Sequence, residues 1–398
     1  MFILFESQIY PDSLLNEFEF KSKGILDYAA HNLSKSILEG LKQNNQTIMA
    51  VNTPNLGSYP LLYKSLFVKG AILDDGVSIP FINLSYLKRF DIRRRLRKEM
   101  QKQIKAYSKD GEICLLLYNF RCLPFIDILK NSCPQLKVCM VVTDLPEFML
   151  KPKSRILLLF GKLLKTKRTM DQNSLKAIDG FVLLAPEMVS RLGITNKPWI
   201  QIEGIYNSDT KIEDREKEPL KTILYTGNLG LRYGIGTLLE AFHRISGEDY
   251  RLWICGGGEG LDEVKRYCEL DRRIIYKGIL SRAEVIRLQK KATVLINPRN
   301  SGDDYTRYSF PSKTMEYLAS GTPVIMSHLA SIPKEYDAHI YYVEDESIDG
   351  YKNKIMEICN KSTEELRTFG ELASRFISEN KSPMPQMTKV IDFIKSLY

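Results

Sequence analysis

Short apolar runs alternate with helical stretches along the first half of the chain. Runs with the length and bulk of buried strands occupy residues 2–5, 47–51, 113–118, 137–143 and 180–184. Residues 27–43 carry apolar side chains at helical spacing. Strands that alternate with helices imply right-handed crossovers and a parallel sheet covered on both faces. The pattern therefore predicts a doubly wound α/β domain.

A second alternation follows a polar, charged stretch at residues 207–219. Strands are predicted at 222–226, 251–255, 274–277, 293–297 and 323–326, with helices at 235–245, 263–269, 282–291 and directly before the last strand. The polar stretch has no apolar periodicity and is interpreted as an interdomain linker. The chain is thus expected to hold two α/β domains, residues 1–205 and residues 220–381.

Composition supports a globular protein. Of 398 residues, 44% are hydrophobic and 26% charged, and the seven cysteines show no paired metal-ligand spacing, so we expect reduced thiols in a cytosolic protein. No run approaches the roughly 20 apolar residues that span a bilayer, and Glu6 interrupts the early apolar run, so no signal peptide is expected.

The net charge of +9 is concentrated in two basic stretches. Residues 88–105 hold nine Lys or Arg against two acids, and residues 151–168 hold seven with no acid. Neither stretch has the interleaved aromatics or motifs of nucleic-acid readers, so no nucleic-acid partner is expected. The apolar residues 156, 159, 160, 163 and 164 share one helical face, which fits either an interfacial helix on an anionic membrane or a helix with a buried apolar face and a basic outer face.

The stretch 308–325, YSFPSKTMEYLASGTPVI, predicts a loop, a short helix and a buried strand. Pro311 suits the first helical turn, and Gly321 followed by Pro323 ends the helix. The first N–H groups, those of Ser312, Lys313 and Thr314, would form a site for phosphate.

Glu316 lies about one turn beyond Lys313 on the same helix face, where its carboxylate would accept hydrogen bonds from two ribose hydroxyls. Phosphate and ribose together indicate a nucleotide. The alternative is a solvated Lys–Glu pair that stabilises the helix by roughly 0.2–0.5 kcal/mol.

The same stretch resembles the signature helix of family 4 of the retaining nucleotide-sugar glycosyltransferases. The family pattern is Glu, seven residues and Glu, then an Ala-rich helix, Gly, a small residue, Pro and a Val/Ile strand. Glu316 and ASGTPVI match its second half, whereas Tyr308 stands where the first Glu is usual. The resemblance implies that Glu316 contacts the ribose and that Tyr308, Ser309 and Phe310 lie near the donor sugar. The run FPSK resembles a branch found in surface-polysaccharide assembly, in which Ser and Lys face the diphosphate.

A glycine-rich loop, GNLGLRYGIG, follows the predicted strand 222–226. Its glycines allow close approach of a diphosphate at the next helix, but their spacing is not that of dinucleotide-binding proteins. The loop resembles the family's phosphate loop, with Asn228 where Arg is usual and Tyr233 where Lys is usual. Each lost charge-assisted hydrogen bond is worth roughly 1.5–3 kcal/mol, so Lys313 is the expected replacement, with Arg299, Arg232 or Arg307 as a helper.

Four further residues complete the predicted site. Gly227 opens the phosphate loop, and the resemblance places Gly278 and Ile279 beside the base. In the first domain, Asp144 follows the strand 137–143, where the family commonly carries a His or an acid near the reacting sugars. Asp144 would hydrogen-bond the acceptor hydroxyl or take its proton, and the alternative is a turn or cap residue before Leu-Pro.

The resemblance implies the GT-B fold, two Rossmann-like domains facing each other across a cleft, with the terminal helix 382–398 returning to the first. It also implies transfer of a sugar from a UDP- or GDP-sugar to a glycan acceptor, free or lipid-linked. No metal or other cofactor is expected, and the catalytic candidates are Lys313, Glu316 and Asp144. Alternatives are a sugar-nucleotide epimerase, a catalytically idle GT-B subunit and, least favoured by glycine spacing, an oxidoreductase.

Overall fold

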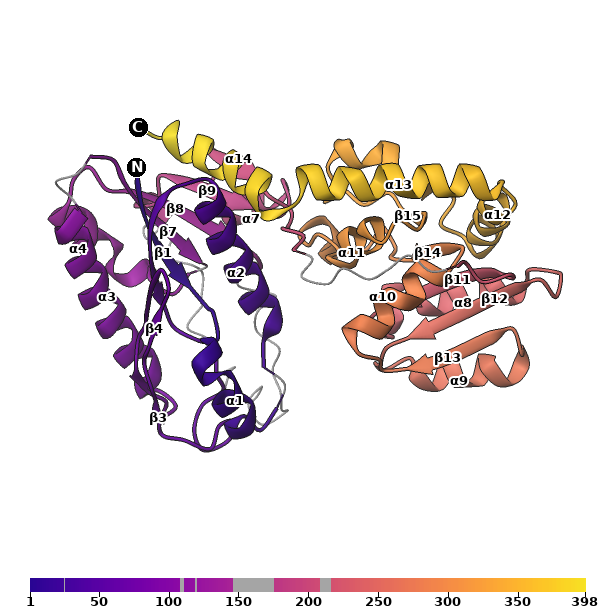
Figure 1. Cartoon of the computed structure of the whole chain (residues 1–398), viewed down its shortest axis with the longest axis horizontal. Coiled ribbons are helices and arrows are strands. Elements are labelled where there is room, and N and C mark those ends of the chain that lie inside the picture. The colour runs from indigo at the N-terminus through magenta and orange to yellow at the C-terminus, as the bar shows by residue number, and fades with distance from the viewer. Residues whose placement is uncertain (25, 108–110, 119, 146–174, 208–215) are drawn as a thin grey trace. The chain divides into compact units, whose positions relative to one another are not determined.

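The computed structural model describes residues 1–24, 26–107, 111–118, 120–145, 175–207 and 216–398 (Figure 1). The chain divides into an N-terminal unit, Met1–Ile205 with Pro383–Tyr398, and a C-terminal unit, Tyr206–Ser382. The second unit thus begins at the start of the predicted linker, earlier than residue 220.

The N-terminal unit contains an eight-stranded sheet in the order β10-β9-β8-β7-β1-β2-β5-β4. Its strands are β1 (Phe2–Ser7), β2 (Thr47–Asn52), β4 (Ala71–Leu73), β5 (Gly76–Ser78), β7 (Ile113–Tyr118), β8 (Lys137–Val142), β9 (Gly180–Leu183) and β10 (Trp199–Gln201). All neighbours are parallel except β4 and β5, and β3 (Phe67–Val68) pairs with β6 (Phe81–Ile82) in a separate small sheet. The predicted parallel sheet is therefore present, extended by a hairpin at one edge.

Helices cover both faces of this sheet. The described helices of the unit are α1 (Asp12–Lys21), α2 (Tyr28–Gln43), α3 (Leu87–Tyr107), α4 (Ile126–Ser132), α7 (Met188–Leu192) and α14 (Pro383–Lys395), with the 3-10 turn η1 (Leu123–Phe125). In Figure 1, α3 and α4 lie on one side of the sheet and α2 and α14 on the other. The basic stretch 88–105 forms most of α3, which buries Ile92, Leu96, Met100 and Ile104 at helical spacing.

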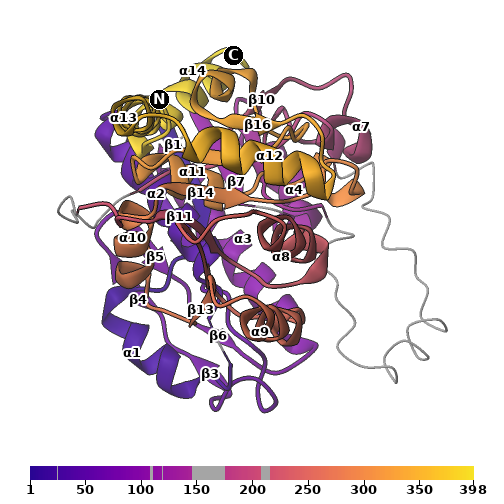
Figure 2. The same ribbon diagram turned by 90° about the vertical axis from the view of Figure 1, so that its right-hand side faces the viewer.

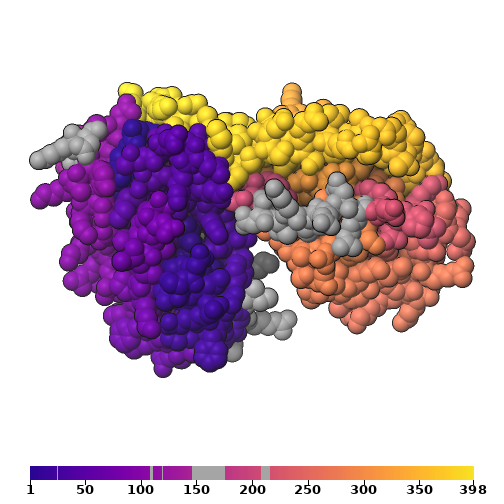
Figure 3. Space-filling model, in the orientation of Figure 1, coloured from indigo at the N-terminus to yellow at the C-terminus, as the bar shows by residue number. Residues whose placement is uncertain are grey.

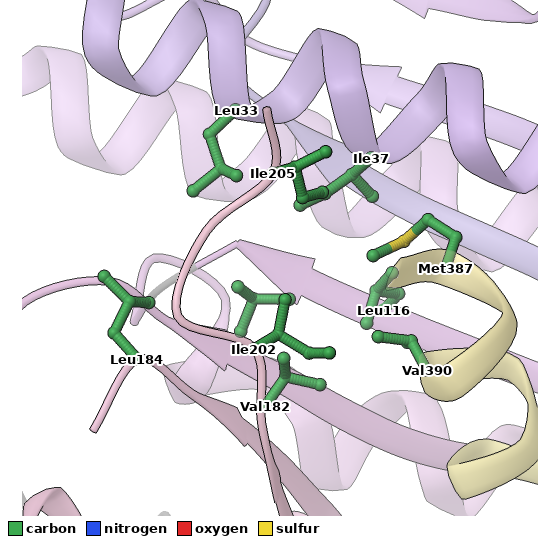
Figure 4. Close-up of a pocket in the computed structure, with 10 residues that line it drawn as sticks. Leu33, Ile37, Leu116, Val182, Leu184, Ile202, Ile205, Met387 and Val390 are labelled. Carbon is green, nitrogen blue, oxygen red and sulfur yellow. The ribbon is translucent and has the colours of Figure 1, made fainter. Parts of the chain in front are cut away.

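The face under α2 and α14 holds one core, in which Ile3 and Phe5 of β1 contact helical residues such as Ile37 and Val390. Next to it lies an apolar cavity of about 10 Å³ bounded by Leu33, Leu116 and Met387, among others (Figure 4). That volume is at the lower limit for a single water, and apolar walls offer a water no partner, so the cavity is a packing gap and no substrate pocket.

The C-terminal unit is a six-stranded parallel sheet in the order β13-β12-β11-β14-β15-β16. Its elements are β11 (Lys221–Thr226), α8 (Ile235–His243), β12 (Tyr250–Cys255), α9 (Leu261–Leu270), β13 (Ile274–Gly278), α10 (Arg282–Lys291), β14 (Val294–Asn297), α11 (Lys313–Ala319), β15 (Val324–Ser327), β16 (Tyr341–Val343), α12 (Ile348–Cys359) and α13 (Thr363–Asn380). Short 3-10 turns η2 (Leu231–Tyr233), η3 (Asp304–Arg307) and η4 (Lys334–His339) lie in its loops.

Two cores flank this second sheet because strand side chains point alternately to its two faces. Ile223 and Tyr225 of β11 pack with α8, α9 and α12, whereas Leu224 packs with α11 and α13 on the other face. Figure 2 shows the two groups of helices on opposite sides of β11 and β14, and in the space-filling view of Figure 3 the last residues of this unit, in yellow, lie along one border of it. With both faces covered, the carboxyl ends of the strands and their loops are where polar chemistry can be placed.

Candidate functional site

The loops after β11, β12 and β14 touch one another through glycines. Gly227 donates its N–H to the Cys255 carbonyl (3.0 Å), and a Cβ on Gly256, whose φ is +134°, would lie 1.8 Å from the Gly227 oxygen. A Cβ on Gly234 would lie 1.7 Å from the Pro298 oxygen. Only glycine fits at these positions, so the three loops form one closely packed edge.

Asn228 shapes the first of these loops. Its Oδ1 accepts a hydrogen bond from the Gly230 N–H (2.8 Å), and its carbonyl accepts one from the Tyr225 hydroxyl (2.6 Å). Such a turn holds successive backbone groups in place but supplies no charge. The positive charge expected at residue 228 must therefore come from elsewhere in the site.

Two arginines lie against the ring of Tyr233, the residue that stands where lysine is usual. The guanidinium of Arg232 lies 4.8 Å and that of Arg299 5.1 Å from its ring centre, and Tyr305 packs edge-on against the same ring. The Tyr305 hydroxyl also donates to the Arg232 carbonyl (3.1 Å). The structure thus brings together two of the cations that the sequence offered as replacements, held on aromatic faces beside the Gly227 loop.

Helix α11 carries Lys313 and Glu316. Lys313 Nζ contacts Glu316 Oε1 at 2.8 Å, and Gln289 Nε2, from α10, donates to the same oxygen at 2.7 Å. Glu316 Oε2 is the oxygen that can accept from a hydroxyl. Gln289 is fully buried, and sequence reasoning missed it, although a glutamine three residues after buried Ile286 was a signal.

The start of α11 differs from the prediction. The helix begins at Lys313, two residues after Pro311, and the Thr314 N–H donates to the Pro311 carbonyl (2.8 Å). The expectation that the Thr314 N–H is exposed for phosphate is therefore wrong, because the first turn closes on it. Ser312 is exposed and its side chain caps no N–H group.

The residues before the helix are only partly available. Phe310 is 5% exposed and packs in the core against Tyr336, so its side chain offers little surface to a ligand, and its predicted place near the donor sugar stays a prediction. Tyr308 follows η3 and is half-buried. The Ser309 carbonyl accepts a hydrogen bond from Ser331 Oγ (3.2 Å).

Tyr317 ties α11 to the end of β11. Its buried hydroxyl accepts from the Thr226 N–H (2.7 Å) and donates to the Thr226 carbonyl (2.9 Å). These bonds fix the helix that carries Lys313 against the strand that leads into the glycine loop. The sequence alone did not indicate that Thr226 is the partner of Tyr317.

The end of β13 adds an apolar neighbour and a further cation. Gly278 has a φ of +82° and accepts a hydrogen bond from the Gly256 N–H (2.9 Å), while Ile279 is 80% exposed beside Gly257. Burial raises the pKa of the Cys255 thiol to about 11, and the nearby charges of Lys277 and Lys313 oppose that rise. Several cations therefore surround the glycine loops.

The N-terminal unit has a polar edge of its own. Arg121, after β7, donates from Nη1 to the carbonyl (3.1 Å) and hydroxyl oxygens of Thr53, after β2, and the same nitrogen lies 3.8 Å from Glu6 Oε1. Glu6 is completely buried; its Oε2 accepts the Tyr118 N–H (3.1 Å) and its Oε1 has no hydrogen-bond partner. Burial raises the pKa of this carboxyl to about 7.

Asp144 follows β8 on this edge. It keeps exposed surface, yet the desolvation of its carboxyl, with a smaller contribution from the charge of Asp27, raises its pKa. Asn55 Nδ2 donates to Asp27 (3.0 Å), so the loops after β2 and β8 meet near the start of α2. Some of the predicted features lie outside the described residues: positions 119 and 146–148 of the predicted loops, the basic stretch 151–168 and most of the predicted linker. Within the described residues, no cluster of three His, Cys, Asp or Glu side chains is arranged to hold a metal ion.

Residues 207–380, which lie in the C-terminal unit, match the family model described as Glycosyl transferases group 1. No curated protein matches the chain.

Solved structures match the chain over its whole length. Sucrose-phosphate synthase from Thermosynechococcus elongatus is 15% identical with a TM-score of 0.58, covering 100% of both chains. The apo lipopolysaccharide outer core galactosyltransferase WaaB is 14% identical with a TM-score of 0.60, also covering 100% of both chains. The catalytic domain of starch synthase IV from Arabidopsis thaliana, bound to ADP and acarbose, is 9% identical with a TM-score of 0.62, covering 100% of this chain and 99% of that one.

At these identities the structural likeness establishes the fold, and the family match establishes the type of the second domain. The GT-B fold class predicted from the sequence is confirmed. Residues 207–380 form a Glycosyl transferases group 1 domain, carried by a chain that has the GT-B fold of glycosyltransferases.

Proposed function

We propose that this protein is a retaining glycosyltransferase that moves a sugar from a UDP- or GDP-sugar to a glycan acceptor, free or lipid-linked, in the synthesis of a surface polysaccharide. One observation carries the proposal: the glycine loops after β11, β12 and β14 converge beside Lys313, Arg232 and Arg299. Close backbone approach and fixed positive charge are what a nucleoside diphosphate requires. ADP and UDP are named with solved relatives of the same fold.

In this proposal the donor diphosphate binds at the Gly227 loop, with Asn228 shaping the turn. Lys313, Arg232 and Arg299 supply the charge, and the exposed Ser312 hydroxyl faces the same group. Glu316 accepts from the ribose through Oε2, while Gln289 holds Oε1 in place. Gly278 and exposed Ile279 border the base.

The leaving diphosphate gains negative charge as the sugar departs. Preorganised cations at the Gly227 edge would stabilise this charge, as donors aimed at developing charge do in many enzymes. We therefore expect transfer without a bound metal or other cofactor.

On the acceptor side we propose that Asp144 holds the attacking hydroxyl. Its raised pKa makes the carboxylate a better hydrogen-bond acceptor and proton acceptor than an ordinary aspartate. Tyr308 and Ser309 are left as the residues nearest the donor sugar.

We expect the enzyme in the cytoplasm, at the inner face of the membrane. No described helix is both long and apolar enough to cross a bilayer. The proposed contact through residues 151–168 stays a prediction, since those residues lie outside the described part of the chain.

Thermal stabilisation by UDP, GDP, ADP and NAD tests the donor site. A ligand at 100 times its Kd adds about 2.7 kcal/mol to the folded state, and Lys313→Ala should remove that shift. The matched control is Lys354→Ala, because Lys354 makes the same kind of pair with Glu357 (2.8 Å, three residues apart) on α12. Loss of the shift in both variants, or in neither, would contradict the assignment.

A second candidate is an idle GT-B subunit that binds a donor without transferring it. Tyr308 in place of the usual acid favours this reading, because tyrosine cannot supply the same carboxylate. Donor binding without turnover over a panel of glycan acceptors would support it, and release of a transferred product would exclude it.

A further inference from the structure

Large apolar side chains lie exposed at one end of the N-terminal unit. This apolar end consists of Phe20 (75% exposed), Leu61 (77%), Leu62 (48%), Phe67 (62%), Tyr86 (97%), Leu87 (52%) and Phe90 (69%). Globular proteins seldom leave so many large apolar side chains together in water without a partner. Single exposed leucines are ordinary, but here seven side chains come from three parts of the unit: the end of α1, the segment 59–68 and the start of α3.

Backbone hydrogen bonds hold these parts side by side. The Lys23 and Lys64 N–H groups donate to the carbonyls of Leu62 (3.0 Å) and Lys21 (2.9 Å), which joins the end of α1 to the segment 59–68. That segment pairs through β3 with β6, directly before α3. Figures 1 and 2 both show α1, β3 and the neighbouring part of the unit at the same end.

Tyr86 is strained as well as exposed. Its φ of 71° lies in the left-handed region, which bulky residues avoid because Cβ comes too close to the following carbonyl oxygen. The ring gains no burial in return, being 97% exposed. A folded chain without a partner at this position would be more stable with glycine or asparagine there.

The outer side of α3 continues from the apolar end as a basic face. Leu87 and Phe90 are followed along the helix by exposed Arg94, Arg97 and Lys98. At 1.5 Å per residue these cations stand about 6–12 Å from Phe90. Lys88 is not part of this face, because its ammonium group turns inward to the Leu56 carbonyl.

We propose that the apolar end and the basic face of α3 attach the protein to an anionic phospholipid bilayer. Interfacial segments bury their apolar residues about 5–10 Å into the headgroup and acyl boundary. With the apolar end at that depth, Arg94, Arg97 and Lys98 stand at the level of the lipid phosphates, where each adds attraction. Charge complementarity therefore selects an anionic membrane as the occupant of this surface.

This surface contains none of the residues proposed to bind the donor and none of residues 151–168. It also does not depend on the proposed reaction, since adsorption to a bilayer needs no sugar chemistry. A failure of one assignment therefore leaves the other standing.

The test is sedimentation of the full chain with vesicles of phosphatidylcholine, with and without phosphatidylglycerol. We expect binding only with phosphatidylglycerol, weakening as salt is raised. A triple variant, Arg94→Gln with Arg97→Gln and Lys98→Gln, should weaken vesicle binding on the order of 100-fold, because each lost basic residue weakens it about fivefold. The control is a second triple variant at exposed sites of the C-terminal unit, Lys265→Gln with Arg287→Gln and Arg375→Gln. It removes the same charge and should leave vesicle binding unchanged.

A second variant tests the apolar part. Tyr86→Gly with Phe90→Gln should keep or raise the thermal stability, because the strain at residue 86 is relieved, while weakening vesicle binding at least tenfold. The proposal would be overturned by no binding of the wild type, by equal losses in the two charge variants, or by unchanged binding after Tyr86→Gly with Phe90→Gln. It would also be overturned by a wild-type dimer that this double variant converts to monomer, because the surface would then be a contact between copies of the chain.

Discussion

Replacement of Glu6 by glutamine should make the N-terminal unit more stable at neutral and alkaline pH. The Glu6 carboxyl is completely buried in β1, and its pKa is raised by burial, with Arg121 and the Tyr118 N–H opposing that rise. Below pH 4.5 the carboxyl is protonated in the folded and the unfolded chain alike, so it has no effect on the balance. As pH rises, the unfolded chain releases the proton first, and stability is lost until about pH 7.

The expected size follows from the pKa values. The difference between 4.5 and about 7, at about 1.4 kcal/mol per pKa unit, corresponds to about 3 kcal/mol. Glutamine does not titrate, and its amide oxygen can still accept the Tyr118 N–H. The unfolding free energy of Glu6→Gln minus that of the wild type should therefore rise by about 3 kcal/mol from pH 4 to pH 8, mostly between pH 5 and pH 7.

Urea unfolding can report on this unit alone. The chain has two tryptophans, Trp199 in β10 of the N-terminal unit and Trp253 in β12 of the C-terminal unit. In a Trp253→Phe background, fluorescence follows only Trp199. A difference that is constant across the pH range, whatever its sign, would refute the reasoning, because it would mean that Glu6 titrates alike in both states.

Two further predictions concern the C-terminal unit. Tyr317→Phe leaves the Thr226 N–H and carbonyl without their buried partner and should cost about 1–3 kcal/mol of unfolding free energy. Trp253 fluorescence in a Trp199→Phe background measures this in urea, and an unchanged midpoint would show that the hydroxyl does not anchor α11. Gly256→Ala would place a Cβ 1.8 Å from the Gly227 oxygen and push the two loops apart, so stabilisation by UDP or GDP should disappear while circular dichroism still shows a folded chain. Full nucleotide binding by Gly256→Ala would place the site away from these loops.

The fold class was predictable because buried strands of a parallel sheet are visible as local apolar runs. Strand β1 and helix α2 lie close to their predicted ranges, and so does β11. The hairpin of β4 and β5 was not predicted, since strands of three residues at a sheet edge carry little periodicity. Sequence reasoning also did not show that the basic stretch 88–105 is a helix with one buried face.

The site was predictable only where local chemistry decides it. The glycines of the Gly227 loop and the helix with Lys313 and Glu316 are local features, and the structure brings them to one edge. The bond from Tyr317 to Thr226 spans 91 residues and that from Tyr118 to Glu6 spans 112, and no pattern in the sequence indicates such partners. An acid within an apolar strand run was nevertheless a signal for Glu6, because a buried carboxyl needs a compensating neighbour.

Helix α14 makes the N-terminal unit depend on the last part of the chain. Met387, Val390, Ile391 and Ile394 belong to the same core as β1, and α14 packs along α2. During synthesis the first 205 residues leave the ribosome long before this helix, so the face of the sheet that α2 and α14 share is covered by α2 alone while the C-terminal unit is made. The core of the N-terminal unit is thus completed last although that unit is translated first, and chaperone binding to the uncovered part of the face is expected until α14 has emerged.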